Sequence, residues 1–307
     1  MPIIEIEGLH KKYRRLRGGE TRALDGLDLT VDEGGVFGFL GPNGAGKTTT
    51  IRCLLALVQP SAGSCRILGV DSKRELANVI TRIGSIVETP AMFPNFSGRR
   101  NLLLLGRIQG IGPRTVDAVL ERVGLASRAN DKVRTYSLGM KQRLGIAAAL
   151  LKDPELLILD EPANGLDPAG IKEVRDLLRN LGREGRTVFV SSHILSEVQQ
   201  VCDRVAILAR GKCVASGPVR DVLTRGRATG LIVGLDELER GAAVLKAKGI
   251  DAVVDGGVIR VNIPPPEAAK VTKILATEEL YVTLLRPDEV DLETVFLELT
   301  GEGGEPT

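Results

Sequence analysis

The chain opens with an alternation of apolar and polar side chains. Ile4 and Ile6 alternate with Glu5 and Glu7, and the run from 27 to 31 repeats the same pattern. A period of two is typical of a strand that buries one face and leaves the other in water. The pattern therefore predicts two half-buried strands at the start of the chain.

The next apolar run, 36–40, lacks this alternation and ends in a glycine-rich loop. After the loop, Ile51, Leu54, Leu55 and Val58 fall on one helical stripe. We therefore expect a buried strand, a loop and a helix in succession.

Two later apolar runs, 156–159 and 188–190, are predicted to be strands that are buried on both faces. A helix between them is expected to begin near Pro168, with Asp167 as its N-cap. The segment 98–152 has a helical pattern throughout. Together these elements predict an α/β fold, in which helices flank a parallel sheet and a helical insert interrupts it.

The residues after 217 differ in character from those before. Their pattern predicts a small α+β unit of the βαββαβ kind, which we treat as a separate domain at 218–307. Its expected elements are, in order, strand 231–234, helix 238–248, strands 252–255 and 258–263, helix 267–275 and strand 281–285.

Composition limits the classes of function. Lys and Arg number 41 against 39 Asp and Glu, so no basic field indicates nucleic acid as a partner. The chain lacks a Cys-x-x-Cys pair and a signal-peptide pattern, and no apolar run reaches the roughly 18 residues of a membrane span. We expect a cytosolic protein with reduced thiols at Cys53, Cys65, Cys202 and Cys213.

A phosphate-binding loop follows the apolar run 36–40. Its glycines let backbone N–H groups turn toward phosphate oxygens, and the following helix adds positive partial charge. Lys47 is expected to reach the β and γ phosphates of a nucleotide, and Thr48 to bind Mg²⁺. The predicted nucleotide-binding residues of this loop are Gly41, Pro42, Asn43, Gly44, Ala45, Gly46, Lys47, Thr48 and Thr49.

Two carboxylates, Asp160 and Glu161, follow the run 156–159 directly. They are expected at the carboxyl end of a parallel strand, the edge where open α/β sheets bind ligands. We assign Asp160 to the Mg²⁺ shell, and Glu161 to the orientation or deprotonation of the attacking water.

The segment from Tyr136 to Arg143 lies just upstream of that strand and resembles the signature of the ABC ATPases. The usual signature is Leu-Ser-Gly-Gly-Gln. Ser137 and Gly139 match it, whereas Leu138 and Met140 depart from it. A serine hydroxyl, a glycine and a helix N-terminus still offer donors to a γ-phosphate.

This resemblance implies further site residues. His193 corresponds to the family's switch histidine, Asn164 to Asp167 to its dimer-contact loop, and Tyr13 to an aromatic that stacks on adenine. Glu88 stands where most relatives carry a glutamine that senses Mg²⁺, so we expect Glu88 near the metal. The aromatic segment from Met92 to Phe96 is predicted to dock a helix of a membrane partner.

The resemblance is specific over residues 1–217 and extends to the bacterial antibiotic-efflux ATPases of the bacitracin and daunorubicin type. It implies the phosphate-loop ABC ATPase fold at 1–217, with an antiparallel β subdomain and a helical subdomain at about 90–152. It also implies ATP and Mg²⁺ as cofactors, a second ATPase subunit, and a permease in a separate chain. The protein would then lie at the inner face of the cell membrane and power export of a drug, antibiotic or lipid-like substrate.

Two other classes of function remain open at this stage. One is a soluble ABC ATPase that acts on nucleic acid or the ribosome, although neither a long coiled coil nor a second cassette is present. The other is an assembly or regulatory protein with a soluble partner. The sequence does not name the transported substrate, the identity of the second subunit or the role of the C-terminal domain.

Overall fold

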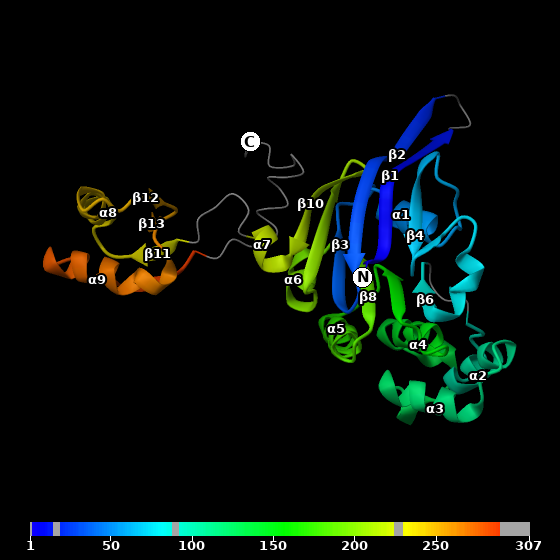
Figure 1. Cartoon of the computed structure of the whole chain (residues 1–307). Helices are drawn as coiled ribbons and strands as arrows, with labels where there is room; N and C mark the ends of the chain where they lie inside the picture. The colour runs from blue at the N-terminus through cyan, green and yellow to red at the C-terminus, as the bar shows by residue number, and fades with distance from the viewer. Residues whose placement is uncertain (1, 15–18, 88–91, 224–229, 289–307) are drawn as a thin grey trace. The chain divides into compact units, whose positions relative to one another are not determined.

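The computed structural model describes residues 2–14, 19–87, 92–223 and 230–288. These residues form two compact units, the first reaching Val219 and the second beginning at Arg220. Each unit combines helices with strands and has its own hydrophobic core (Figure 1).

The first unit begins with a four-stranded antiparallel sheet of order β2-β1-β4-β5. The strands are β1 (Pro2–Arg14), β2 (Glu20–Asp32), β4 (Ala62–Ile67) and β5 (Val70–Asp71). Ile4 pairs with Val31 and Ile6 with Leu29, and all four side chains are buried. The two half-buried strands predicted from the alternation are confirmed.

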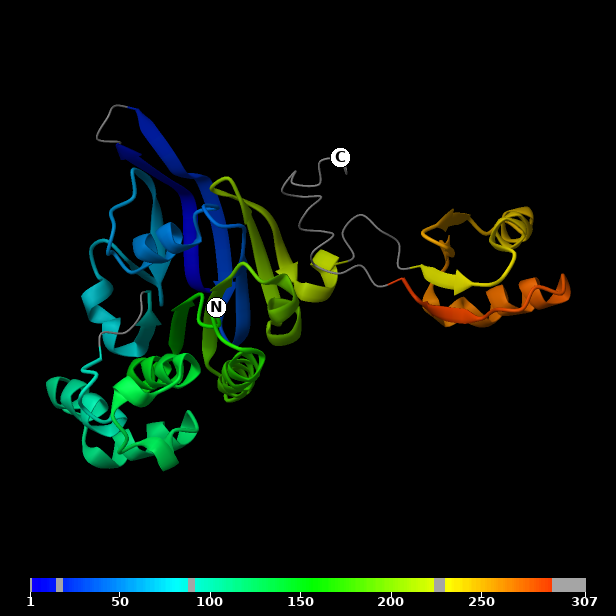
Figure 2. The same cartoon turned by 180° about the vertical axis from the view of Figure 1, so that it is seen from behind.

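A six-stranded sheet of order β10-β9-β3-β8-β7-β6 forms the centre of this unit (Figures 1 and 2). Its strands are β3 (Gly35–Leu40), β6 (Ile83–Ile86), β7 (Leu156–Asp160), β8 (Thr187–Ser192), β9 (Arg204–Ala209) and β10 (Lys212–Pro218). All neighbours are parallel except β10, which is antiparallel to β9. The predicted parallel sheet is confirmed.

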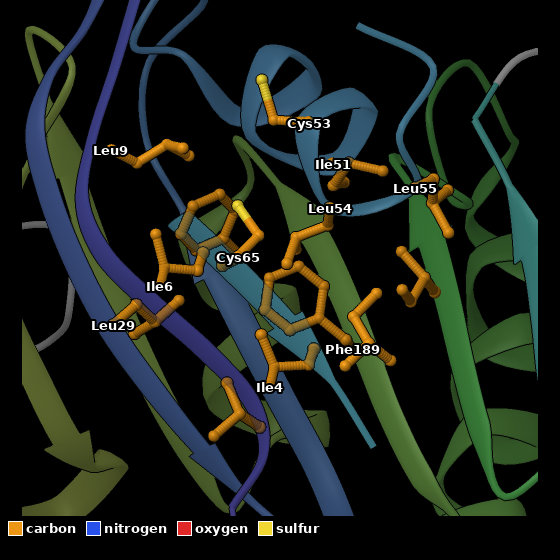
Figure 3. Close-up of a cluster of buried hydrophobic side chains, with 14 of the residues drawn as sticks. Ile4, Ile6, Leu9, Leu29, Ile51, Cys53, Leu54, Leu55, Cys65 and Phe189 are labelled. Carbon is orange, nitrogen blue, oxygen red and sulfur yellow. The ribbon is translucent and has the colours of Figure 1, made fainter. Parts of the chain in front are cut away.

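The main core of the first unit lies between these two sheets and helix α1 (Lys47–Leu54). Figure 3 shows Ile4, Ile6 and Leu29 facing Ile51 and Leu54 of the helix, with Phe189 of β8 among them. The core fixes the helix that follows the phosphate-binding loop.

Helix α1 ends earlier than its apolar stripe suggests. The stripe was expected to include Leu55 and Val58, but the helix stops at Leu54. Ala56 adopts a left-handed backbone conformation with φ 54°, which turns the chain out of the helix.

The predicted helical insert is confirmed and consists of α2 (Gly98–Ile108), α3 (Pro113–Arg122) and α4 (Leu138–Leu150). Three more helices are α5 (Pro168–Arg183), α6 (Leu195–Val201) and α7 (Val219–Leu223). The predicted start of α5 is also confirmed, because Asp167 is its N-cap and accepts a hydrogen bond of 3.2 Å from the Gly170 backbone N–H.

The second unit has the predicted order of elements. It contains β11 (Leu231–Gly234), α8 (Leu238–Ala247), β12 (Ala252–Asp255), β13 (Val258–Val261), α9 (Ala268–Thr277) and β14 (Leu284–Pro287), and the antiparallel sheet has the order β12-β13-β11-β14. The expected last strand, 281–285, was placed three residues too early. Leu280 still closes the end of α9 by donating to Leu275, so pairing with β11 starts only at Leu284.

The described cysteines are all free thiols, as expected. Burial raises the pKa of Cys65 to about 12 and also raises the pKa values of Cys53 and Cys202, so these thiols stay protonated. Cys213 is only half-buried, in contrast to the others. None of the helices in the described ranges has the length and apolar character needed to cross a membrane.

Candidate functional site

The phosphate-binding loop lies between β3 and α1, as the sequence predicted. Gly44 and Gly46 have φ values of 84° and 112°, which glycine adopts without strain. A Cβ atom at Gly46 would lie 2.7 Å from the carbonyl oxygen of Ala23, so only glycine fits there. The loop therefore leads directly into the N-terminus of α1, where free N–H groups favour an anion.

Lys47 is a buried cation, with 4% of its side chain exposed. Its ammonium donates a hydrogen bond of 2.7 Å to the carbonyl of Gly41 and lies 3.1 Å from Oε1 of Glu161. A buried charge of this kind requires close partners of opposite polarity. The phosphate-binding loop and the end of β7 are thus joined through Lys47.

Asp160 is held from two sides. Thr48 Oγ1 donates to Asp160 Oδ2 at 2.6 Å, and Ser191 Oγ donates to Asp160 Oδ1 at 2.5 Å. Ser191 in turn accepts a hydrogen bond of 2.9 Å from the backbone N–H of Glu161. These bonds fix the orientation of the carboxylate at the mouth of the phosphate-binding loop.

Glu161 connects Lys47 to His193. Its second carboxylate oxygen, Oε2, lies 2.5 Å from Nδ1 of His193. Its backbone has φ 48°, a left-handed conformation that is uncommon for a residue other than glycine and costs on the order of 1–3 kcal/mol. Strain of this kind is concentrated at functional sites, which supports a functional role for this turn.

The predicted signature residues stand at the start of α4. Ser137 is the N-cap, and its Oγ accepts a hydrogen bond of 3.2 Å from the Met140 backbone N–H. Gly139 is buried where α4 approaches α5; a Cβ atom there would lie 3.5 Å from the Cα of Gly170. Helix α4 begins at Leu138, directly after Ser137, because Ser137 supplies the cap.

A cleft of about 640 Å³ separates the phosphate-binding loop from the helical insert. Asn43, Thr48, Asp160, Glu161 and Asn164 line one side, and Leu138, Lys141 and Gln142 of α4 line the other. Ser137 and Gly139 do not belong to this lining. The phosphate-binding loop and the two carboxylates therefore share this cleft, whereas Ser137 lies outside its lining.

Four other predicted residues have different outcomes. Tyr13 is 37% exposed on β1 with the Lys11 ammonium 4.9 Å above its ring, and it lies outside the cleft lining. Asn164 reaches the cleft, and Asp167 caps α5. Glu88 lies outside the described residues.

Sequence reasoning assigned no role to Ser191, although it bonds to both predicted carboxylate positions. The signal in the sequence is a serine at the end of the apolar run 188–190. The structure adds that Ser191 pairs with Asp160 across β7 and β8 and is fully buried. A fully buried polar residue at the end of an apolar strand requires a hydrogen-bond partner, and the neighbouring strand ends in a carboxylate.

The fold and the joined loop and carboxylates define a phosphate-loop nucleotide-binding cassette. The family profile described as ABC transporter matches residues 24–164 of this chain. The ABC transporter ATP-binding protein YhcH of Bacillus subtilis (strain 168) is 42% identical over 98% of this chain and 96% of its own length. The chain therefore belongs to the ATP-binding proteins of the ABC transporter family, whose reaction is ATP hydrolysis for transport.

Other similar proteins belong to the same family. The bacitracin transport ATP-binding protein BcrA of Bacillus licheniformis is 42% identical over 98% of each chain. The daunorubicin resistance ATP-binding protein DrrA3 of Streptomyces coeruleorubidus is 38% identical over 97% of this chain and 96% of its own length. The resemblance drawn from the sequence is confirmed.

Solved structures agree on the fold. An ATP-binding cassette in its ADP conformation, MJ1267, has a TM-score of 0.65 at 23% identity and covers 74% of this chain and 96% of its own. A bacterial ABC transporter cassette solved in a dimeric structure, MJ0796, has a TM-score of 0.64 at 25% identity and covers 71% and 99%. The predicted phosphate-loop ABC ATPase fold is confirmed.

Proposed function

We propose that two copies of this chain bind ATP head to tail, each nucleotide lying between the phosphate-binding loop of one copy and Ser137 of the other. The observation that carries this proposal is the direct bonding of Lys47 to Glu161 and of Thr48 to Asp160. These two contacts bring the phosphate-binding loop and the two carboxylates together at one edge of the sheet, where they form one half of an ATP site. Ser137 stands outside the cleft lining, which favours its use by a second copy.

Each side chain of this half site has its own proposed role. Lys47 and the loop N–H groups bind the β and γ phosphates. Glu161 orients or deprotonates the attacking water, while Lys47 and His193 hold its two oxygens. Tyr13 contributes adenine stacking from β1, and the pair Ser137 and Gly139 supplies donors to the γ-phosphate of the partner's nucleotide.

Thr48 and Asp160 have the chemistry of a Mg²⁺ site. Mg²⁺ prefers oxygen ligands and is commonly held by one or two protein groups together with substrate phosphates and water. No group of three or more His, Cys, Asp or Glu side chains in the described ranges is arranged to hold a metal alone, which fits that mode. When bound, Mg²⁺ neutralises charge on the β and γ phosphate oxygens. Glu88 is proposed as a further residue near this metal.

Ser191 provides a test of the Mg²⁺ assignment. We expect Ser191→Ala to raise the Mg²⁺ concentration needed for half-maximal hydrolysis by about 10–100-fold, because Asp160 loses its orienting hydroxyl. A Mg²⁺ titration of ATP hydrolysis measures the change. Ser192→Ala is the matched control, since the hydrogen bonds of its hydroxyl within the described ranges are to the backbone of Ile194. Equal Mg²⁺ curves for the two variants would contradict the assignment.

We further propose that hydrolysis powers export of a drug, antibiotic or lipid-like substrate through a separate membrane subunit. The names of the bacitracin and daunorubicin relatives support the class of substrate. The finding that no described helix is suited to cross a membrane supports a separate permease. The chain would then be cytoplasmic and bound at the inner face of the cell membrane.

An aromatic ledge, made by Phe93 and Phe96, suits such a partner. Phe93 is 59% exposed, and its ring centre lies 5.3 Å from that of Phe96. The Arg100 guanidinium covers Phe96 at 3.9 Å, and the Asn101 side chain accepts a hydrogen bond of 2.7 Å from the Phe93 backbone N–H. The ledge is thus an exposed apolar surface held in a fixed position, which is typical of docking surfaces.

Affinity purification from membranes tests the partner. We expect the wild-type chain to retain an integral membrane polypeptide, and Phe93→Ala to lose most of it while ATP hydrolysis by the purified chain is unchanged. Ile108→Ala is the matched control, because Ile108 is an 84% exposed apolar residue on the same helical insert. Retention of a soluble protein or nucleic acid in place of a membrane polypeptide would contradict the proposed transport role.

A further inference from the structure

The position of Ser137 depends on how α4 is held, because Ser137 caps the first turn of that helix. Helices α4 and α5 lie side by side (Figures 1 and 2). Near their first turns they approach closely, since a Cβ atom at Gly139 would lie 3.5 Å from the Cα of Gly170. Apolar contacts of this kind have no preferred direction, whereas hydrogen bonds do. Polar contacts are therefore needed to fix the rotation of α4 about its axis.

Arg143 supplies such contacts from the second turn of α4. Its side chain is only 13% exposed, and Nη1 donates hydrogen bonds of 3.0 Å and 3.1 Å to the carbonyls of Val123 and Gly124. Nη2 lies 3.0 Å from Oε2 of Glu173 on α5. Nε has no hydrogen-bond partner among the described residues, so the two terminal nitrogens hold the guanidinium. One largely buried cation thus joins α4 both to the end of α3 and to α5.

The end of α3 suits this guanidinium. The helix ends at Arg122, and Gly124 follows with φ 67°, a left-handed conformation that is usual for glycine just beyond a helix. A Cβ atom at Gly124 would lie 3.0 Å from Nη1 of Arg143, so glycine also lets the arginine approach. The last carbonyls of a helix lack partners within it and carry partial negative charge, which favours a cation.

The ion pair between Arg143 and Glu173 continues the glycine contact along the same two helix faces. Gly139 and Arg143 are four residues apart, and Gly170 and Glu173 are three apart. Both spacings place residues on one face of a helix. Two successive contacts fix the direction of α4 along α5 as well as the distance between them. Ser137, just before the first contact, is then held in a defined position.

We propose that Arg143, together with Glu173, is a positioning residue for Ser137 and therefore acts on the nucleotide that the partner copy binds. The inference rests on the proposed head-to-tail pair and adds a residue to it. Arg143 itself touches no nucleotide; its effect reaches the partner's site through the N-terminus of α4. Loss of its contacts displaces the donors that α4 offers to the γ-phosphate, and small displacements of such donors lower the rate.

Steady-state kinetics of full-length chains give the first test. We expect Arg143→Met to lower kcat about tenfold, because methionine keeps an apolar stem but reaches neither α3 nor Glu173. Glu173→Gln removes only the ion pair, so its kcat should fall about threefold, and it serves where Arg143→Met does not fold. Lys172→Ala is the control, since Lys172 is the exposed neighbour of Glu173 on α5. Unchanged kcat in both variants would exclude a positioning role.

Mixed dimers of two differently tagged full-length chains test whether the effect crosses to the partner. In the first mixture, one chain carries Glu161→Gln and the other Arg143→Met, so the remaining Glu161 is paired with an unchanged α4. In the second, one chain carries both changes and its partner neither, so the remaining Glu161 is paired with the altered α4. We expect the first mixed dimer to hydrolyse ATP about tenfold faster than the second. With Glu173→Gln in place of Arg143→Met, the ratio should be about three.

Equal rates in the two mixtures, or the reverse order, would overturn the inference. The reverse order would mean that Arg143 supports the site of its own chain. The same mixtures with Ser137→Ala in place of Arg143→Met test the proposed function separately, because a head-to-tail pair again makes the first mixture faster. If Ser137→Ala shows this order and Arg143→Met does not, only the inference fails. If Ser137→Ala does not show it, the head-to-tail pair itself is wrong.

Discussion

Replacing Glu161 with glutamine is expected to lower ATP turnover by about 10²–10⁴-fold, while ATP stays bound. Glutamine keeps the size of the side chain, so Lys47 and the phosphate-binding loop retain their positions. It cannot accept the proton of the attacking water. Steady-state phosphate release and equilibrium ATP binding measure the two effects separately.

Glu155→Gln is the matched control for this change. Glu155 directly precedes β7, at the strand end opposite Glu161, and forms an exposed ion pair with Arg82. We expect its turnover to equal that of the wild type. Turnover near the wild-type rate in Glu161→Gln would remove Glu161 from the catalytic role.

Replacing Lys47 with alanine is expected to weaken both ATP binding and turnover, each by about 10²–10³-fold, because a preorganised positive donor to the phosphates is lost. The change also removes the cation that lies 3.1 Å from Glu161, so the carboxylate loses a fixed orientation. Isothermal calorimetry with Mg-ATP and a hydrolysis assay measure the two losses.

Lys73→Ala serves as the control, since Lys73 is an exposed lysine of the same unit. It should bind and hydrolyse ATP like the wild type. A Lys47→Ala chain with undiminished affinity would mean that the nucleotide does not use this loop.

Much of the fold followed from local patterns. The alternation at Ile4 and Ile6 and the apolar runs that became β7 and β8 reflect which faces are buried, and burial is what periodicity reports. Element ends were less predictable. Helix α1 stops because Ala56 turns left-handed, and β14 starts late because Leu280 still closes the end of α9. Both are local turns that the spacing of apolar residues does not report.

The candidate site was also predictable only in part. The meeting of Lys47 with Glu161 and of Thr48 with Asp160 was predictable, because each residue lies in a motif at the end of a predicted parallel strand. The role of Ser191 depended on the pairing of β7 with β8, which a single sequence does not reveal. The left-handed turn at Glu161 was equally hidden, since nothing in its residue type requires it.

We propose above that ATP joins two copies of this chain. Sedimentation velocity of Glu161→Gln with and without Mg-ATP tests it most directly, because the variant retains ATP that the wild type would hydrolyse. We expect a species of twice the 32.8 kDa chain mass in the presence of Mg-ATP, and a monomer when ATP is withheld or Ser137 is also replaced by arginine. A chain that binds Mg-ATP and remains a monomer would contradict it.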